Sequence, residues 1–356
     1  MTKRQKMKIA ALISGGVDSS VALNILKNEG HDLTAFYLKV WLEDELAFLG
    51  KCPWEADLKF VRAVCDQLDV PLEVISLQSE YLERVVSYAL DELLAGRTPS
   101  PDIFCNQRIK FGAFFDHIDS SYEKVATGHY AQIAQSNGTY HLKRAPDPIK
   151  DQTYFLSGMY QSQVARALFP IGNMMKSDVR QLARDFNLPN QARKDSQGIC
   201  FLGKIRYPDF IAFHLGEKKG DIIDRETGQI LGPHRGYYYY TIGQRYGLGL
   251  GGGPWYVVQK DIERNIIYVS HATKHKNTSR NQFVATNPNW IAEPPDKTAL
   301  QLKLRHGPEL LNCKIEATDD NHLSVTIAEK DSGIAPGQFA VFYDGDLCLG
   351  SAVIDH

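Results

Sequence analysis

The feature that most constrains the fold is a glycine turn near the start of the chain, between an apolar run and an amphipathic stretch. Residues 14–20 read Ser-Gly-Gly-Val-Asp-Ser-Ser, after an apolar run at 9–13 and before a helix-like spacing of apolar side chains at 21–26. Adjacent glycines let the backbone turn without a Cβ in the way, so that backbone amides can line an anion. Serine hydroxyls and the positive end of the helix dipole strengthen the same preference. The sequence therefore predicts a phosphate pocket between a buried strand and a helix.

Asp18 conflicts with a simple phosphate pocket, because its carboxylate repels phosphate unless Mg²⁺ lies between them. No lysine follows the glycines, so the turn does not match the G-x-x-x-x-G-K-[ST] pattern. It resembles instead the SGGxDS loop of the ATP pyrophosphatases, enzymes that cleave ATP between the α and β phosphates and adenylate a substrate. That resemblance implies ATP with Mg²⁺ as the bound species. The plain alternative is a Gly-Gly turn capped by serines.

The first part of the chain alternates between two kinds of pattern. Strand-like runs lie at 8–14, 33–40, 72–77 and 124–130, and helix-like stretches lie near 19–29, 56–68, 79–95 and 105–118. This alternation predicts an α/β fold, with a doubly wound, mostly parallel sheet covered by helices on both faces. Ligands of such sheets bind outside the carboxyl ends of the strands. We therefore expect the 14–20 turn, the segment at 38–41, the loop at 96–105 and the segment at 127–130 to meet at one edge.

The pattern changes twice after the first part of the chain. A hairpin is expected around Asn137-Gly138, followed by helices at 161–169 and 177–187. From about residue 217 the strands are short and glycine is frequent, with a strand-like run at Tyr237–Tyr240, and the last 75 or so residues alternate in strand fashion. We expect a catalytic domain at 1–208, a small linking domain at 209–275 that contacts a nucleic acid, and an antiparallel β barrel at 276–356.

Composition limits the partners and the compartment. The 356 residues carry 40 Lys and Arg against 42 Asp and Glu, a net charge of −2 that gives no global attraction to a polyanion. A nucleic acid would need local basic patches. Candidates for such contacts are Arg193, Lys194, Lys218, Lys219, Lys274, Lys276 and Arg280. The chain has no membrane-length apolar run, and its basic start lacks a signal-peptide core, so we expect a cytoplasmic protein without a membrane partner.

Six cysteines, at 52, 65, 105, 200, 313 and 348, include no C-x-x-C pair, so neither a tightly bound metal nor an iron–sulfur cluster is expected. Cys105 follows a loop with two prolines and stands where a helix is expected to start. The nearby Arg108 and Lys110 favour a thiolate there, and Asp102 is close enough to act as acid, base or helix cap. A capped helix with a buried cysteine fits equally well. The glycine-flanked stretch around Cys200 predicts an ordered loop, where a packed thiol is the ordinary alternative.

Taken together with the ATP-type loop, the two cysteines make the chain resemble the bacterial-type tRNA-specific 2-thiouridylases, which thiolate the wobble uridine of certain tRNAs. The shared motifs follow the family order over nearly the whole chain. They are the turn at 14–20, Gly96-Arg-Thr-Pro with Pro101-Asp and Cys105-Asn, Ala126-Thr-Gly-His-Tyr130, Lys150-Asp-Gln, Asp195-Ser with Gly198-Ile-Cys-Phe, Thr241-Ile-Gly-Gln-Arg-Tyr-Gly-Leu-Gly and Pro336-Gly-Gln.

The resemblance implies a role for each matching residue. It implies ATP contacts at Leu12, Ile13, Ser14, Gly15, Gly16, Val17, Asp18, Ser19, Leu38 and Gly128. It makes Cys105 the nucleophile, Cys200 the persulfide carrier and Asp102 the proton handler. It implies contacts to the target base or the tRNA at Ser100, Pro101, Asp102, His129, Lys150, Asp151, Gln152, Arg305, His306 and Gln338. Ser100 stands where the family usually has asparagine, and His306 where it commonly has tyrosine.

The implied chemistry adenylates the uridine C2 oxygen and replaces it with sulfur from a Cys200 persulfide. Either the persulfide attacks C2 directly and Cys105 resolves the sulfur–sulfur bond, or Cys105 releases sulfide inside a closed site. Both routes end in a Cys105–Cys200 disulfide that a reductant opens. The family acts on tRNAs for Lys, Glu and Gln, and the donor is a cysteine desulfurase or a relay protein.

Two other functions are compatible with parts of the sequence. Another ATP pyrophosphatase that adenylates a small molecule would share the loop but would have no use for Cys105 and Cys200. A non-catalytic RNA-binding relative would be indicated by loss of Asp18 or of either cysteine, and all three are present. The remaining Cys65, Cys313 and Cys348 lie in apolar patterns and are expected in the core, whereas Cys52 receives no role.

Overall fold

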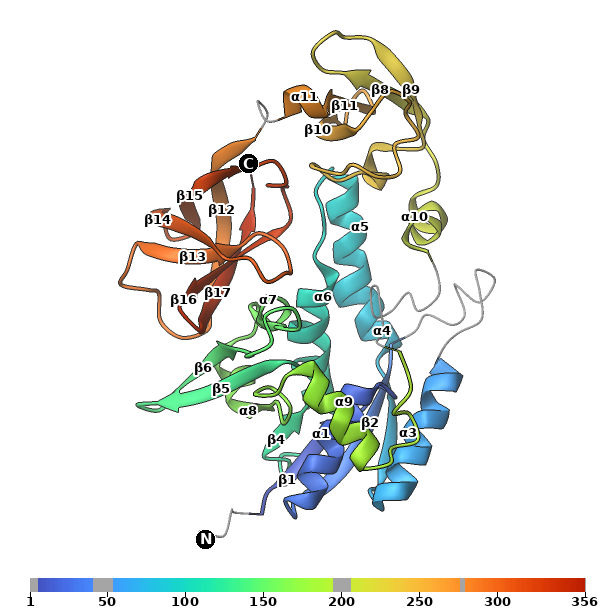
Figure 1. Cartoon of the computed structure of the whole chain (residues 1–356), viewed down its shortest axis with the longest axis vertical. Coiled ribbons are helices and arrows are strands. Elements are labelled where there is room, and N and C mark those ends of the chain that lie inside the picture. Colours follow the sequence, from blue (N-terminus) through green and yellow to red (C-terminus); the bar gives the residue numbers. More distant parts are fainter. Residues whose placement is uncertain (1–5, 41–53, 195–205, 276–278, 356) are drawn as a thin grey trace.

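The computed structural model describes residues 6–40, 54–194, 206–275 and 279–355, and these form three parts (Figure 1). A parallel-sheet part lies at the bottom of Figure 1, a small middle part at the top and a barrel beside them. The helix α5 (Ser87–Leu94) leads from the parallel-sheet part up to the middle part. None of the helices in the described ranges has the length and apolar character needed to cross a membrane.

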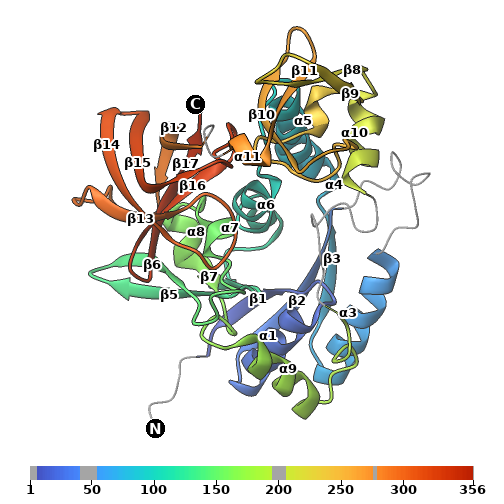
Figure 2. The same ribbon diagram turned by 45° about the horizontal axis from the view of Figure 1, so that its top comes forward.

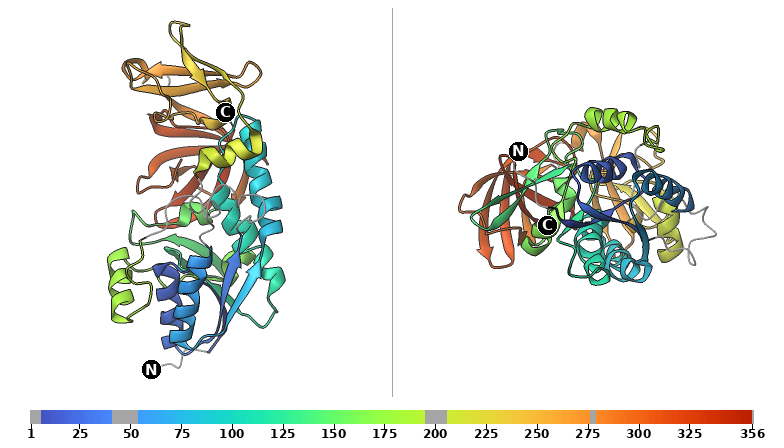
Figure 3. Two further views of the ribbon diagram at one scale, coloured as in Figure 1. Left: turned by 90° about the vertical axis from the view of Figure 1, so that its right-hand side faces the viewer. Right: turned by 90° about the horizontal axis from the view of Figure 1, so that it is seen from below.

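The parallel-sheet part has the strand order β3-β2-β1-β4-β7, and its strand pairings are all parallel. The strands are β1 (Lys8–Leu12), β2 (Asp32–Lys39), β3 (Leu72–Ser76), β4 (Lys124–Ala126) and β7 (Ala167–Leu168). Ile9 and Ala11 pack with α1 (Val17–Asn28) and α3 (Trp54–Leu68), whereas Ala10 between them packs into a second cluster with Tyr81 and Phe114. Successive side chains of a strand face opposite sides, so both faces are covered and the doubly wound expectation is confirmed (Figure 3).

Two helical stretches follow β3 and lead to Cys105. The first runs through α4 (Gln78–Tyr81), a π-helical turn (Leu82–Val86) and α5. The second runs through α6 (Pro101–Phe104), a π-helical turn (Cys105–Lys110) and a 3₁₀ turn (Ala113–His117). The expectation that this helix starts at Cys105 is wrong. It starts at Pro101, because proline has a preset φ and no N–H to leave unpaired in a first turn.

The expected hairpin is present as β5 (Ala131–Ser136) and β6 (Thr139–Arg144), with Asn137 and Gly138 at φ of 51° and 81°. Such positive φ values are typical of the two-residue turns that match strand twist. Further along the chain come α7 (Thr153–Leu156), α8 (Gln161–Arg166) and α9 (Lys176–Asp185). The helix expected at 161–169 stops at Arg166, because the next two residues turn extended and pair with β4 as β7.

The middle part is a four-stranded sheet in the order β10-β11-β8-β9. Its elements are α10 (Tyr207–Leu215), β8 (Gly220–Asp224), β9 (Ile230–His234), β10 (Trp255–Asp261), β11 (Ile266–His271) and α11 (Ala272–His275). The prediction of a strand at Tyr237–Tyr240 is wrong. Gly236, with a φ of 144°, starts a 3₁₀ turn, and the rings of Tyr237, Tyr238 and Tyr240 are buried as core residues.

The barrel closes on itself in the order β12-β15-β14-β13-β16-β17, with β12 paired to β17, and all its pairings are antiparallel. Its strands are β12 (Arg280–Trp290), β13 (Ala299–Lys303), β14 (Leu311–Asp319), β15 (His322–Asp331), β16 (Phe339–Asp344) and β17 (Leu347–Ile354). The β-barrel expectation is thus confirmed. The sequence did not indicate that β6 pairs with β17, so that the hairpin of the parallel-sheet part extends the barrel sheet (Figure 2).

The described cysteines, Cys65, Cys105, Cys313 and Cys348, are all buried. Burial raises the pKa of Cys65 to about 11 and that of Cys313 to about 12, and it also raises the pKa of Cys348. These three thiols are therefore core groups, as expected. Cys52 and Cys200 lie outside the described residues.

Candidate functional site

The 14–20 turn joins the carboxyl end of β1 to the start of α1. Gly15 adopts a φ of 75°, and a Cβ there would lie 2.7 Å from the Asp57 carbonyl oxygen, so this turn requires glycine. The Ser19 hydroxyl accepts the backbone N–H of Ser14 at 3.2 Å and donates to the Gly16 carbonyl at 3.1 Å. Gly16 is the N-cap residue of α1, and because glycine has no side chain, it makes no capping hydrogen bond to the first amides of the helix. Exposed Ser14 and the uncapped start of α1 are therefore open to an anion.

The other residues expected to contact ATP surround this turn. The side chains of Ile13 and Val17 are buried, so a nucleotide would meet their backbone. A Cβ on Gly128 would lie 2.6 Å from the Ser19 nitrogen, which explains why the segment after β4 carries glycine where it crosses α1. Leu12 and Leu38, at the carboxyl ends of β1 and β2, are partly buried against the large central cluster that also contains Cys105.

Asp18 is held by two side chains from distant parts of the chain. The Lys176 ammonium lies 2.7 and 2.8 Å from its two carboxylate oxygens, and the Tyr130 hydroxyl donates to it at 3.0 Å. Lys176 starts α9 and is mostly buried, with 14% of its side chain exposed. The site therefore contains a cation beside the turn. Lys176 was not predicted from the sequence, since nothing local to α9 distinguishes it from a surface lysine.

Two residues that follow α9, Asn190 and Arg193, hold the 14–20 turn through the carbonyl of Gly15. The Gly15 carbonyl accepts Nδ2 of Asn190 at 2.8 Å and Nη1 of Arg193 at 3.1 Å, and Arg193 also pairs with Asp57. Arg193 was expected among the contacts to nucleic-acid phosphates. Its guanidinium stabilises the turn, and the expected phosphate contact remains a prediction.

Cys105 and Asp102 lie one helical turn apart, on α6 and the π-helical turn that continues it. Residues at this spacing are neighbours on a helix surface. Cys105 is buried, with 3% of its surface exposed. Burial raises the pKa of the Asp102 carboxyl, and the charge of Lys110 opposes that rise. Just before them, Pro101 begins α6 and the backbone N–H of Ser100 donates to the Tyr88 hydroxyl at 3.3 Å.

His129 is buried at the end of the segment after β4. Its Nδ1 lies 2.6 Å from the Thr127 hydroxyl, and its ring packs beside Phe111 and Phe169 at centroid distances of 6.5 and 5.8 Å. Burial, and secondarily the charge of Lys110, lowers its pKa well below the usual value. The imidazole is therefore neutral, and the sequence-based expectation of a tRNA contact remains a prediction.

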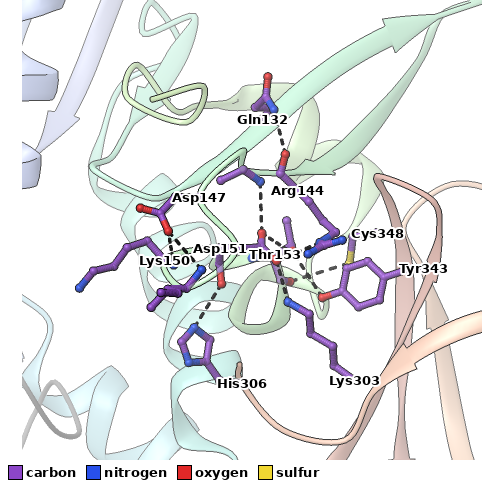
Figure 4. A network of polar contacts seen from close by, with 12 residues as sticks. Gln132, Arg144, Asp147, Lys150, Asp151, Thr153, Lys303, His306, Tyr343 and Cys348 are labelled. Carbon is purple, nitrogen blue, oxygen red and sulfur yellow. Dashed lines mark hydrogen bonds and ion pairs between the residues drawn. The ribbon is translucent and has the colours of Figure 1, made fainter. Parts of the chain in front are cut away.

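Asp151, expected at the surface of a tRNA site, is instead the centre of a buried polar network between the parallel-sheet part and the barrel (Figure 4). Its Oδ2 accepts Nζ of Lys303 from β13 at 2.8 Å, and both side chains have no exposed surface. Arg144 Nε lies 3.4 Å from the same oxygen, and the Thr153 hydroxyl lies 2.9 and 3.0 Å from the two oxygens. The Tyr343 hydroxyl of β16 lies 3.1 Å from that of Thr153.

This network brings other expected contact residues together. His306 Nε2 lies 3.1 Å from the Asp151 carbonyl oxygen, and its ring stacks on Phe155 at 4.7 Å. Next to Asp151, the side chain of Gln152 accepts the backbone N–H of Tyr130 at 2.9 Å, and partly exposed Lys150 donates its backbone N–H to Asp147. The network thus joins the 150–152 segment to the loop after β13.

Two further residues expected to contact tRNA lie on barrel loops. The Arg305 guanidinium donates to Asp331 at 2.6 Å and is otherwise exposed. Gln338 follows the turn before β16, and its carbonyl accepts the backbone N–H of Ile354 at 2.7 Å. The loop that carries Gln338 lies beside the segment that leads to the expected base contacts, because the Pro336 carbonyl accepts the backbone N–H of Thr98.

Fold and site together define an α/β nucleotide-binding protein with two appended β parts. Residues 7–204, 208–271 and 280–354 match three family models, described as the tRNA methyl transferase HUP domain, the tRNA methyl transferase PRC-barrel domain and the aminomethyltransferase beta-barrel domain. The chain is 46% identical to the tRNA-specific 2-thiouridylase MnmA of Parabacteroides distasonis, over 98% of this chain and 99% of that one. It is 44% identical to the protein of that name from Porphyromonas gingivalis, with the same coverage. The chain belongs to the tRNA-specific 2-thiouridylase family.

The buried ion pair makes a prediction about stability. Lys303→Met leaves the Asp151 carboxylate buried without its main partner, so the free energy of unfolding should fall by about 3–5 kcal/mol. The double variant Asp151→Asn, Lys303→Met removes both charges and should recover part of that loss. Urea unfolding of the two single variants and the double variant completes the cycle.

The matched control is Lys297→Met, which breaks an exposed pair with Asp344 in the same barrel and should change stability by about 0–1 kcal/mol. Equal losses for Lys303→Met and Lys297→Met would contradict the account of the buried pair.

Proposed function

We propose that this chain replaces the C2 oxygen of a wobble uridine in tRNA with sulfur, consuming ATP and releasing AMP and pyrophosphate. The observation that carries the proposal is the combination of an open anion-binding turn, with Asp18 and Lys176 beside it, and Cys105 one helical turn from Asp102. The named activity of the relatives supports it. The family-model descriptions mention methyl transfer, but a turn suited to pyrophosphate serves adenylation, which prepares a carbonyl carbon for attack by sulfur.

In the first step the uridine C2 oxygen attacks the α phosphorus of ATP, and pyrophosphate leaves. We assign to Lys176 and the amides at the start of α1 the stabilisation of the charge that develops on the departing phosphates, because they lie beside the turn. The Asp18 carboxylate is partly exposed and binds the Lys176 ammonium through both oxygens, so Mg²⁺ that enters with ATP would share this carboxylate with Lys176. When bound with ATP, this ion would be held by Asp18 and would neutralise phosphate charge.

In the second step sulfur displaces AMP from C2. The terminal sulfur of a Cys200 persulfide bonds to C2, and the Cys105 thiolate then attacks the inner sulfur, so that the bond electrons pass to the transferred atom. Alternatively, Cys105 first releases hydrosulfide, which attacks C2. Both routes oxidise the two cysteines to a disulfide, and a two-electron reductant restores them. Asp102, with its raised pKa, exchanges the proton near the base.

The proposal includes partners and a division of the chain. We assign catalysis to 1–208, a tRNA-contacting linking role to 209–275 and the barrel to 276–356, in a cytoplasmic enzyme. The tRNA contacts are proposed at Ser100, Pro101, Asp102, His129, Lys150, Gln152, Arg305, His306 and Gln338. The acceptors are tRNAs for Lys, Glu and Gln, and a cysteine desulfurase or relay protein supplies sulfur.

The direct test is mass spectrometry of nucleosides from unthiolated tRNA, incubated with the protein, ATP, Mg²⁺, cysteine and a desulfurase. The 2-thiouridine product should form with wild type and be lost in Cys105→Ser and Cys200→Ser. Cys65→Ala, which removes a buried core thiol, is the matched control and should retain activity. AMP without a thiolated base would point to a different acceptor. Full activity of either serine variant would contradict the cysteine roles.

Lys176 makes a separate prediction about the adenylation step. Lys176→Met removes the cation beside the turn, so AMP formation at saturating ATP and tRNA should fall by about 10²-fold or more, as for loss of one charge-stabilising donor. Lys176→Arg keeps the charge and should retain most of the rate. The measurement is AMP release by chromatography in a single turnover. A wild-type rate for Lys176→Met would remove this residue from the mechanism.

The raised pKa of Asp102 predicts a pH dependence. The deprotonated carboxylate is the base, so the single-turnover thiolation rate should fall with decreasing pH, with a midpoint above the ordinary aspartate value of about 3.9. The charge of Lys110 lowers this pKa, so Lys110→Met should move the midpoint upward and Lys110→Arg should leave it in place. A midpoint that is unchanged in Lys110→Met would exclude Asp102 as the titrating group.

A further inference from the structure

Residues of three shared motifs, none of them given a role in the proposed chemistry, meet at Thr98. Its backbone N–H donates to the Pro336 carbonyl of the barrel at 2.7 Å. Its hydroxyl donates to the Thr241 hydroxyl of the middle part at 3.4 Å. Thr98 itself belongs to the segment that joins α5 to α6 in the parallel-sheet part. One residue is therefore bonded to all three parts of the molecule, and we call residues 92–100 the junction segment.

The barrel approaches the junction segment so closely that only glycine fits. Gly337 has a φ of 87°, and a Cβ there would lie 2.8 Å from both Glu92 Oε2 and the Thr98 carbonyl oxygen, and 2.9 Å from Arg97 Cβ. Real Cβ atoms essentially never come within 3.0 Å of other atoms, so a larger residue displaces the segment. The glycine of the Pro336-Gly-Gln motif is thereby explained by packing against the junction segment.

The middle part approaches the same segment from the other end. Gly96 has a φ of 73°, and a Cβ there would lie 2.6 Å from Cδ1 of Ile262. The Tyr237 hydroxyl donates to the Leu94 carbonyl at 2.7 Å. Figure 2 shows the end of α5 lying against the middle part. The junction segment is thus held between the two β parts.

The junction segment is also stiff within itself. The Arg97 guanidinium binds the Glu92 carboxylate through two hydrogen bonds, of 2.8 and 2.5 Å, and its backbone N–H donates to the Glu92 carbonyl. Such two-point pairing fixes orientation as well as distance. A movement of either β part would therefore also move the junction segment. That segment ends at Ser100, directly before Pro101 and Asp102.

We propose that the junction segment is a positioning device, which sets Asp102 and Cys105 in place only when the middle part and the barrel are both seated against Thr98. This inference rests on the proposed function, because its purpose is to align the thiol and the carboxylate with a base whose tRNA is held by the two β parts. Thr98 and Gly337 contact no reacting atom, so their effect is on the rate of the bound complex rather than on its formation.

The test compares Gly337→Ala with Gly345→Ala. Gly345 also has a positive φ, of 59°, in the barrel, but nothing lies within 4 Å of its Cβ position, so this control shares the backbone strain without the displacement. Gly337→Ala should lower the single-turnover rate of 2-thiouridine formation by tenfold or more, up to about 10²-fold, with the KM for tRNA little changed. Gly345→Ala should keep the wild-type rate, and thermal unfolding of both variants measures the shared strain.

A KM increase without a rate change would mean only that Gly337→Ala disturbs the neighbouring Gln338, and it would overturn the proposal. So would equal rates in the two alanine variants. If Gly337→Ala does not fold, Thr98→Val decides: loss of the hydroxyl should slow the reaction, and Thr98→Ser should restore it.

Alkylation of Cys105 by iodoacetamide, mapped by peptide mass spectrometry, provides a readout that does not depend on the proposed function. The buried thiol should react faster in Gly337→Ala than in Gly345→Ala. Absence of 2-thiouridine from wild type, together with this difference, would contradict the proposed function and retain the positioning role. Equal alkylation rates in the two variants would contradict the positioning role itself.

Discussion

The arrangement of the molecule depends on one buried ion pair, between Asp151 of the parallel-sheet part and Lys303 of the barrel. Each charge has lost its water, and the opposite charge offsets that loss together with the surrounding hydrogen bonds and, for Asp151, the nearby Arg144 guanidinium. The barrel cannot shift away from the parallel sheet without leaving a charge unpaired in a dry environment. Pairing of β6 with β17 adds backbone hydrogen bonds across the same boundary. The relative position of the two parts is therefore specified by polar contacts as well as by apolar packing.

The site follows from this fixed relation. The parallel sheet supplies the anion-binding turn and Asp18 at one strand edge, and α9 returns to that edge with Lys176. The barrel supplies loops that reach the 150–152 segment and the segment before α6. Neither the parallel-sheet part nor the barrel contains all the residues of the candidate site. The anion-binding turn and the loops proposed to contact tRNA are thus carried by parts of the chain that are fixed relative to one another.

Local patterns predicted the parallel sheet, the Asn137-Gly138 hairpin and the barrel, because in these elements side-chain alternation and turn chemistry decide the structure. Local patterns did not predict the structure or the contacts of residues whose partners lie far away in the sequence. Tyr237–Tyr240 has the composition of a strand, but hydroxyl contacts to Leu94 and Gly216 accompany a 3₁₀ turn instead. Lys176 and Asp18 are 158 positions apart, and no spacing rule pairs them. Asp151 matched a tRNA-contacting motif, yet its burial depends on Lys303, 152 positions further along the chain.

Adenylation of the C2 oxygen is the step by which we propose that ATP activates the uridine. It is tested most directly with an anticodon stem-loop RNA that carries oxygen-18 at C2 of the wobble uridine, in a single turnover with ATP and a sulfur donor. Since the C2–oxygen bond breaks when sulfur enters, the departing AMP should carry the label in its phosphate, in proportion to the 2-thiouridine formed. Unlabelled AMP formed alongside 2-thiouridine would contradict adenylation of the C2 oxygen.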